Sequence, residues 1–413
     1  MRRGALVALT ALSFGAGSAH AATAVPGQLI VGFGPQVSQQ LQQELVERAG
    51  GKMRRRLAHI RGAVVGVRSH VALAVLRRRL SAAAGVRYAE PDFYMRASKA
   101  PDDPLLANQY SLDSSGPGYV FAQQAWDSRT SCSKVAVLDT GIQYNHPDIS
   151  PNLWHNPDEI QSNGKDDDKN GWVDDYYGLN IVKGRGSGVD DDGHGTHVAG
   201  TAGGRGNNAT GVAGLCWSSS LMAVKFMDSN GRGSTSDAVD GIDYAIREGA
   251  RIINCSFGSS KKSSALNDEV NYAKSKNTLL VVAAGNDGDN IDSDPIYPAS
   301  FTQGNILTVA ATTSSGALAS YSNYGKKAVD VGAPGDKIFS TYLGSTYKVL
   351  SGTSMAAPLV SATAAMLRKK DSDLTYTQIK DAIRNHTQPL ASLSGKSVSG
   401  GLLNVAAALS SVH

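Results

Sequence analysis

From about residue 130 onward, short apolar segments alternate with helical patterns, and this alternation constrains the fold more than any other feature of the sequence. The apolar segments are KVAVLD (134–139), SLMAVKF (220–226), RIINCSF (251–257), TLLVVAAG (278–285) and NILTVAA (305–311). Strands that are apolar along their whole length are typical of a parallel sheet covered by helices on both faces. We therefore predict a doubly wound α/β domain with a mostly parallel sheet, whose functional residues lie at the carboxyl ends of the strands.

Residues 22–99 have a different pattern, which predicts a small α+β domain. The order is strand, helix, strand, strand, helix, strand, from QLIVGF to VRYAEPDFYM. This order favours a ferredoxin-like sandwich. The following segment KAPDDP (99–104) contains two prolines and no periodicity, which is typical of an exposed, cleavable linker. We expect the larger domain to occupy residues 100–413.

Residues 1–21 have the composition of a secretory signal peptide. Two arginines follow the first methionine, residues 5–16 are mostly apolar, and an Ala-His-Ala sequence ends at Ala21. A short membrane anchor is the alternative, but the apolar run is shorter than the roughly 20 residues that a span needs. We expect cleavage after Ala21 and export to an extracellular or periplasmic location, with no membrane anchor in the mature form.

The charge of the chain is unevenly distributed. Its 41% hydrophobic and 18% charged residues indicate a soluble globular protein. Residues 22–99 carry a net charge of +9 and residues 100–413 carry −7, so the two parts should attract each other. The arginine runs at 54–56 and 77–79 could contact nucleic acid, but no recognition motif accompanies them, and we expect no nucleic-acid partner.

Three motifs occur where such a sheet places its chemistry. VAVLDTGI puts Asp139 at a strand end, DGHGTHVAG puts His194 between two glycines before a helix, and SGTSMAAP puts Ser354 at the start of an apolar helix. The N–H groups at a helix start favour developing negative charge, which suits attack by Ser354 on a carbonyl. Taken alone, a strand-end Asp139 could cap a turn and Ser354 could cap a helix. VVAAGND adds Asn286, whose amide could donate to an oxyanion.

Two features could bind metal. His197 follows His194 by three residues, but helical zinc pairs usually have a spacing of four and a third ligand, so we favour a structural role for His197. The segment 155–180 resembles the start of an EF-hand calcium loop, although Tyr177 replaces the closing glutamate. The candidate calcium ligands are Asp166, Asp168, Asn170, Trp172 (through its carbonyl), Asp174 and Asp175. A solvated acidic loop is the alternative, and a second, weaker calcium loop is possible at 207–211.

The order Asp139, His194, Ser354 matches the aspartate, histidine, serine order of subtilisin. The motifs DTGI, HGTHVAG and GTSMAAP resemble the three catalytic signatures of the subtilisin-like serine protease family. The likeness covers roughly residues 104–410 and continues in INCSFG, AAGN, YPAS and GLLNVAAA. This resemblance implies a serine endopeptidase that hydrolyses peptide bonds in proteins.

The resemblance also implies a role for each matched residue. Ser354 attacks the scissile carbonyl, His194 takes and returns its proton, and Asp139 orients His194. Asn286 and the Ser354 amide hold the oxyanion. Two segments pair with the substrate backbone as added strands, and a third walls the pocket for the residue before the scissile bond. These substrate-binding residues are Gly231, Arg232, Gly233, Ser256, Phe257, Gly258, Ala283, Ala284 and Gly285.

The domain at 22–99 resembles the inhibitory propeptide of the family, which chaperones folding and then blocks the cleft with its own C-terminal strand. We expect a zymogen that cuts itself between about Arg96 and Asp102 and matures to a monomer. The side-chain specificity stays open, because Ile296 could narrow the pocket whereas nearby carboxylates could favour a basic residue. These carboxylates are Asp287, Asp289, Asp292 and Asp294.

The chain contains three cysteines, which in an exported protein permits one disulfide and leaves one thiol. Cys132 and Cys216 precede strands that are neighbours in the sheet of the family, so the resemblance implies a Cys132–Cys216 disulfide with Cys255 buried and free.

Three other functions compete with the protease. They are a catalytically inactive binding protein, a calcium-stabilised adhesion module and an esterase. The first two would not need Asp139, His194 and Ser354 together with an oxyanion donor. An esterase typically places its nucleophile in G-x-S-x-G after a strand, whereas Ser354 lies in G-T-S-M.

Overall fold

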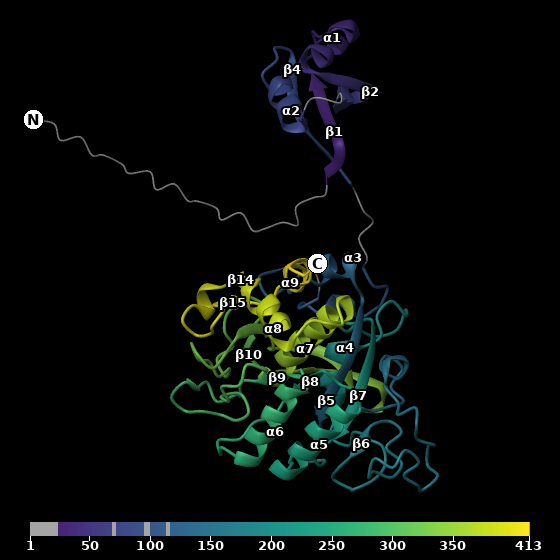
Figure 1. Cartoon of the computed structure of the whole chain (residues 1–413), viewed down its shortest axis with the longest axis vertical. Coiled ribbons are helices and arrows are strands. Elements are labelled where there is room, and N and C mark those ends of the chain that lie inside the picture. The colour runs from purple at the N-terminus through teal and green to yellow at the C-terminus, as the bar shows by residue number, and fades with distance from the viewer. Residues whose placement is uncertain (1–23, 68–71, 95–99, 113–115, 413) are drawn as a thin grey trace, which may run out of the picture. The chain divides into compact units, whose positions relative to one another are not determined.

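The computed structural model describes residues 24–67, 72–94, 100–112 and 116–412, which form two compact units (Figure 1). The units divide between Ala97 and Ser98. The expected signal peptide lies outside the described residues, as do positions 95–99, which include the first part of the expected cleavage region.

The N-terminal unit has the predicted order of strands and helices. Its elements are β1 (Ala24–Phe33), α1 (Gln39–Ala49), β2 (Gly51–Leu57), β3 (Gly62–Val67), α2 (Leu73–Ser81) and β4 (Val86–Phe93). The four strands form an antiparallel sheet in the order β2-β3-β1-β4. Leu29, Val31 and Phe33 alternate along β1 and are buried in the core of this unit, as the two-residue period of a strand requires.

Within the described residues, the C-terminal unit is built on a nine-stranded sheet in the order β14-β15-β11-β10-β9-β8-β5-β7-β6. All its neighbouring strands are parallel except β14 and β15. The strands are β5 (Ser131–Asp139), β6 (Leu179–Asn180), β7 (Ser218–Lys225), β8 (Ile252–Cys255), β9 (Leu279–Ala283), β10 (Ile306–Thr312), β11 (Val331–Pro334), β14 (Gln388–Pro389) and β15 (Gly401–Leu402). Every residue of β8, β9 and β10 is buried, and the mostly parallel sheet confirms the predicted fold class.

Helices cover both faces of this sheet (Figure 1). The helices are α3 (Ala122–Ser128), α4 (His194–Gly203), α5 (Thr235–Arg247), α6 (Ser264–Ser275), α7 (Thr353–Lys370), α8 (Tyr376–Asn385) and α9 (Val405–Ser410). α5 and α6 contribute to the core on one face, while α3, α4, α7, α8 and α9 contribute to the core on the other. α7 is buried from Thr353 to Arg368 and contacts β5, β8, β9, β10 and β11, so its position is fixed by the centre of the sheet.

Two further features tie the larger unit together. The hairpin of β12 (Ile338–Tyr342) and β13 (Thr346–Leu350) packs on α4. The disulfide between Cys132 and Cys216 joins the starts of two paired strands, β5 and β7, with 5.9 Å between the Cα atoms. This pairing confirms the predicted disulfide, and Cys255 is buried and free as expected. Among the described residues, no helix is long and apolar enough to cross a membrane.

Candidate active site

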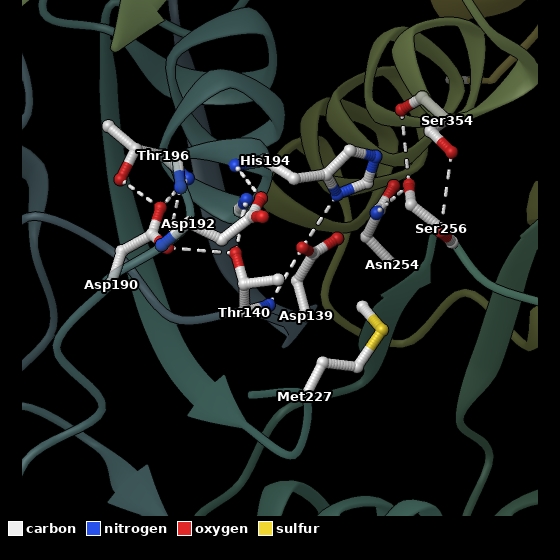
Figure 2. Close-up of polar contacts among 12 residues, drawn as sticks. Asp139, Thr140, Asp190, Asp192, His194, Thr196, Met227, Asn254, Ser256 and Ser354 are labelled. Carbon is white, nitrogen blue, oxygen red and sulfur yellow. Dashed lines mark hydrogen bonds and ion pairs between the residues drawn. The ribbon is translucent and has the colours of Figure 1, made fainter. Parts of the chain in front are cut away.

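The carboxyl ends of neighbouring parallel strands bring the predicted functional residues to one edge of the sheet. Asp139 ends β5, Ser256 directly follows β8, and Asn286 lies three residues after β9. α4 and α7 begin with His194 and Thr353, so Ser354 occupies the second position of α7. Figure 2 shows Asp139, His194, Ser256 and Ser354 converging at this edge.

Asp139 and His194 form the closest polar pair of the site. Nδ1 of His194 lies 2.7 Å from Oδ1 of Asp139, and the backbone N–H of Thr140 donates to the same oxygen at 2.7 Å. Asp139 is fully buried, whereas 27% of the His194 side chain is exposed. Burial by itself lowers the pKa of His194, but the charge and hydrogen bond of Asp139, together with the charges of Asp192 and Asp190, raise it to about 9. The arrangement therefore stabilises a protonated imidazole.

A second set of polar contacts holds the start of α4. Asp190 accepts hydrogen bonds from the Thr140 hydroxyl at 2.9 Å and from the Thr196 backbone at 2.9 Å. Gly193 has a left-handed φ of 104°, and ring atoms of Tyr342 lie 2.5 Å from where a Cβ would be. A side chain at Gly193 would therefore strain the backbone and clash with Tyr342. Asp190 was not predicted as a site residue, because its only signal in the sequence is the acidic run before His194.

Lys225 is a further residue of the site that was not predicted from the sequence. Its side chain is 1% exposed, and its ammonium group donates to the Thr140 carbonyl at 2.7 Å, the Asp191 carboxylate at 2.6 Å and the Met227 carbonyl at 2.8 Å. All three ammonium protons are thus used, as burial of a charge requires. The three acceptors come from the segments after β5, before α4 and after β7, so Lys225 links three loops of the site.

The first turn of α7 carries Ser354 and orients Asn286. The Ser354 side chain lies close to Ser256, and its Oγ donates to the Ser256 carbonyl at 3.3 Å. Oδ1 of Asn286 accepts from the backbone N–H of Thr353 at 2.8 Å and from its hydroxyl at 3.0 Å. Because its oxygen faces Thr353, the amide nitrogen of Asn286 is the group left to donate.

Two hollows are lined by residues of the site, one by His194 and the other by Asn286. The larger, of about 900 Å³, is lined by His194 and by six of the nine predicted substrate-binding residues. These six are Gly231, Arg232, Gly233, Ser256, Phe257 and Gly258. The Phe226 and Phe257 rings pack 4.6 Å apart at its wall.

The second hollow, of about 740 Å³, lies beside Asn286. Gly258, Gly285 and Ile296 line it together with three carboxylates. These carboxylates belong to Asp287, Asp289 and Asp294, whereas Asp292 lines a different hollow. Ala283 and Ala284 are buried in the core at the end of β9, so of the predicted wall residues only Gly285 reaches this hollow.

An acidic cluster occupies the predicted calcium loop. Carboxylate oxygens of Glu159, Asp168 and Asp175 lie within 4.8 Å of one another. Asn170 contributes its amide, which donates to Asp168 at 3.0 Å and to Asp175 at 3.1 Å. Burial raises the pKa of Asp175, and Oε2 of Glu159 is buried with no hydrogen-bond partner among the described residues. Three close carboxylates with an unpaired buried oxygen fit a hard divalent cation such as calcium.

The other predicted ligands lie around this cluster. Asp166 accepts from the backbone N–H groups of Asn170 and Gly171, and Asp174 accepts from those of two residues at 163–164. The backbone N–H of Trp172 donates to the side chain of Asn170 at 2.8 Å. Glu159 was missed because it precedes the alternating pattern.

Two remaining candidates have structural contacts. In the loop 207–211, the backbone N–H of Asn207 donates to Asp103 at 2.7 Å, and the Asn208 side chain donates to Asp148 at 3.1 Å. His197 is buried, and its Nε2 lies 3.0 Å from the carbonyls of both Ile338 and Lys348. Burial lowers the pKa of His197 to about 4. These contacts to the β12–β13 hairpin support a structural role for His197.

Comparisons with known proteins point to one family. Residues 131–402 match the model of the Subtilase family, and residues 13–92 match that of the Fervidolysin N-terminal prodomain. Thermitase of Thermoactinomyces vulgaris is 37% identical over 287 residues, which cover 69% of this chain and 90% of that protein. The thermophilic serine proteinase of Bacillus sp. (strain AK1) is 38% identical over 285 residues, which cover 68% of this chain and 63% of that protein.

The solved structures agree with these relatives. A protease from Pseudoalteromonas arctica PAMC 21717 superposes with a TM-score of 0.64 at 31% identity, covering 76% of this chain and 99% of that chain. A cold-adapted subtilisin-like serine proteinase superposes with a TM-score of 0.55 at 27% identity, covering 67% of this chain and 90% of that chain. The chain thus spans nearly the whole of these two structures, but less than two thirds of the Bacillus relative.

Proposed function

Because the chain belongs to the subtilase family of serine peptidases and carries an N-terminal prodomain, we propose that it is a secreted serine endopeptidase made as a self-processing zymogen. The observation that carries this proposal is the convergence of Asp139, His194 and Ser354 at one edge of a parallel sheet. These three residues are 55 to 215 positions apart in the chain, and their meeting at one edge supports a nucleophile, a base and an orienting carboxylate for acyl transfer.

In the proposed reaction, Ser354 Oγ attacks the scissile carbonyl and its proton passes to Nε2 of His194. The imidazolium that forms is stabilised by Asp139 through Nδ1. His194 then returns the proton to the leaving amine, and an acyl group remains on Ser354. Water then attacks the acyl carbon while His194 takes one of its protons. The bond between the acyl carbon and Ser354 Oγ breaks, His194 returns the proton to Oγ, and the acyl group leaves as a carboxylic acid. In the free enzyme Ser354 Oγ donates to the Ser256 carbonyl, so it must first turn toward His194.

The negative charge on the carbonyl oxygen is held by two proposed donors. One is the amide nitrogen of Asn286, which is left free because Thr353 occupies its oxygen. The other is the backbone N–H of Ser354, in the first turn of α7, where N–H groups lack intrahelical partners. The fixed orientation of Asn286 means that little reorganisation accompanies the reaction.

We propose that protein and peptide substrates bind as an added strand between two segments. These segments are 231–233 and 256–258, which both line the larger hollow. Backbone pairing of this kind accepts many sequences, because main-chain groups supply the hydrogen bonds. We further propose that the mature enzyme acts as a monomer.

The proposed organisation is a signal peptide at 1–21, a propeptide at 22–99 and a peptidase domain at 100–413. The prodomain match and the opposite net charges of the two parts support an inhibitory propeptide. Phe93 and Tyr94 are exposed at the end of β4, just before the proposed cleavage region between Arg96 and Asp102. We propose that the propeptide is retained as an inhibitor until this region is cut.

We also propose that calcium stabilises the peptidase domain. Glu159, Asp168 and Asp175 would hold the ion, with Asn170 as a further oxygen ligand once its amide turns over. The ion would neutralise buried carboxylates and keep the insertion folded, and no catalytic step depends on it.

The proposal is tested by labelling the purified protein with a serine-directed fluorophosphonate. We expect labelling of the wild type, no labelling of Ser354→Ala, and full labelling of Ser275→Ala, which removes an exposed hydroxyl on α6. The Ser354→Ala precursor should also remain uncut when it is expressed without other proteases. An unlabelled wild type, or a normally trimmed Ser354→Ala precursor, would refute the nucleophile or the self-processing respectively.

A further inference from the structure

The helix that carries Ser354 contains a proline four residues later, so the Ser354 carbonyl lacks its usual hydrogen bond within the helix. In an α-helix the carbonyl of residue i accepts from the N–H of residue i+4. For Ser354 that residue is Pro358, inside α7, and proline has no N–H. The Ser354 carbonyl is therefore left without its intrahelical donor, and a buried carbonyl without a partner is unfavourable.

Ser256 supplies the missing donor. Its hydroxyl donates to the Ser354 carbonyl at 3.1 Å, while the Ser354 hydroxyl donates back to the Ser256 carbonyl at 3.3 Å. The segment after β8 and the first turn of α7 are thus joined by reciprocal hydrogen bonds, which Figure 2 shows as two dashed lines between these residues.

The Ser256 hydroxyl is itself oriented by a chain of buried groups. Nδ2 of Asn254 donates to the Ser256 hydroxyl at 2.9 Å. Oδ1 of Asn254 accepts from the hydroxyl of Ser361 at 2.8 Å. Asn254 and Ser361 are both fully buried, so water cannot replace either partner. Each donor has one acceptor along the chain Ser361, Asn254, Ser256, Ser354.

This order of donors removes alternative orientations. A flipped Asn254 amide would accept the proton of the Ser256 hydroxyl and leave the buried Ser354 carbonyl without a donor, so Ser361 donates to Oδ1 and Nδ2 faces Ser256. Because Nδ2 of Asn254 donates to the Ser256 hydroxyl oxygen, the proton of that hydroxyl points away from Asn254 and is donated to the Ser354 carbonyl. Ser361 lies seven residues after Ser354 on α7, so this series of hydrogen bonds links the middle of the helix to its first turn.

The contrast with Thr363 shows that Ser361 does not make the usual contact of a helical hydroxyl. Such hydroxyls normally bond back to the carbonyl four residues earlier. Thr363, equally buried on the same helix, does so with the Leu359 carbonyl at 2.8 Å. The Ser361 hydroxyl instead donates to the side chain of Asn254 on β8.

We propose that Asn254 and Ser361 are positioning residues, which hold the nucleophile Ser354 in place through Ser256 without touching the substrate. The inference rests on the proposed function, because it assumes that Ser354 is the nucleophile. If these hydrogen bonds are lost, the Ser256 hydroxyl is no longer oriented and the first turn of α7 can shift. This shift misplaces both the hydroxyl and the backbone N–H of Ser354. A misplaced nucleophile slows the chemical step and leaves substrate binding unchanged.

The test compares Ser361→Ala with the matched control Thr363→Val, which also removes one buried hydroxyl from α7. We expect Ser361→Ala to lower kcat about threefold to tenfold, the range that one buried hydrogen bond covers, with KM unchanged. The rate of fluorophosphonate labelling should fall by the same factor. Thr363→Val should keep the wild-type kcat even if its Tm falls as far as that of Ser361→Ala. Ser361→Thr, which restores the hydroxyl, should recover kcat.

The outcomes separate the inference from the proposed function. A wild type that neither labels nor cleaves peptides refutes the proposed function. An active wild type whose kcat and labelling rate are unchanged in folded Ser361→Ala, or changed equally in Thr363→Val, refutes the inference alone. If Ser361→Ala does not accumulate as folded protein, Ser361→Cys replaces it, since a thiol fits the site but is a weak donor. Wild-type kcat in Ser361→Cys then refutes the inference.

Discussion

Nδ1 of His194 lies 2.7 Å from Oδ1 of Asp139, and this carboxylate is fully buried while part of the imidazole reaches solvent. A buried carboxylate is poorly hydrated, so its field acts strongly on the adjacent ring. The result is a His194 pKa of about 9, above the ordinary value of 6.5. Since His194 must be neutral to accept the proton of Ser354, this pair sets the pH range of the proposed reaction.

We predict that kcat/KM rises with pH toward a midpoint near 9, the pKa of His194. Asp192→Asn keeps the side-chain shape but removes a charge that raises this pKa, so the midpoint should move to lower pH. The measurement is the pH profile of kcat/KM on one peptide, with Asp237→Asn on α5 as the control. A midpoint that stays in place in Asp192→Asn would contradict the electrostatic explanation.

The same pKa has a consequence for stability. The folded pKa of His194 is raised above its ordinary value of 6.5, so its contribution to the free energy of unfolding is fully present below that pH. It should be lost as the pH rises through about 9. Denaturation of Ser354→Ala, which should not digest itself, measures this dependence. In a double variant that also carries His194→Ala, the part of this pH dependence that comes from His194 should be absent.

Asn286→Ala removes one proposed oxyanion donor. We predict a fall in kcat of about 10²- to 10³-fold with KM nearly unchanged, because the hydrogen bond forms fully only in the transition state. Asn271→Ala, an exposed asparagine on α6, serves as the control. Equal loss through a higher KM would mean that Asn286 binds the ground state instead.

Chelator should lower the Tm of the peptidase domain, and added calcium should restore it. At a calcium concentration of one hundred times Kd the ion contributes about 2.7 kcal/mol. Glu159→Gln should abolish the response, because it removes a carboxylate of the cluster, whereas Asp158→Asn, at the exposed neighbouring position, should retain it. A wild-type Tm that ignores both chelator and calcium would remove the metal from the proposal.

Loss of the Cys132–Cys216 disulfide should destabilise the protein. The bridge closes a loop of 84 residues, for which chain entropy predicts about 4–5 kcal/mol. Reducing agent should therefore lower the Tm of the wild type but not that of the Cys132→Ser and Cys216→Ser double variant. Cys255→Ala, which removes the buried free thiol, should remain sensitive to reductant.

We predict that the hollow beside Asn286 favours a basic residue before the scissile bond. Its lining includes three carboxylates and no basic side chain. Because these carboxylates are exposed, each should change the preference for arginine over leucine only about two- to fivefold. The measurement is kcat/KM for matched peptides with Asp287→Asn and Asp294→Asn, against Asp292→Asn, which lines another hollow. If all variants prefer arginine over leucine to the same extent, the carboxylates do not set the specificity, and Ile296 is left as its determinant.

Local patterns along the chain were enough to predict the fold class and to place the candidate site at one edge of the sheet. Apolar segments such as KVAVLD are buried on both faces wherever they lie in a sheet, so they indicate a parallel arrangement without knowledge of partners. Asp139, His194 and Ser354 could be singled out because strand ends and helix starts meet at one edge of such a sheet. The order of elements in residues 24–93 was predicted from periodicity in the same way.

The tertiary structure alone decided which distant side chains meet. Glu159 joins Asp168 and Asp175 only after the insertion closes on itself, and nothing in its local sequence distinguishes it from a surface acid. Ser361 and Asn254 are 107 positions apart, and their hydrogen bond exists because α7 crosses the sheet over β8. Sequence periodicity reports which face of an element is buried. The partner across that face depends on how the elements pack, and packing is a property of the whole chain.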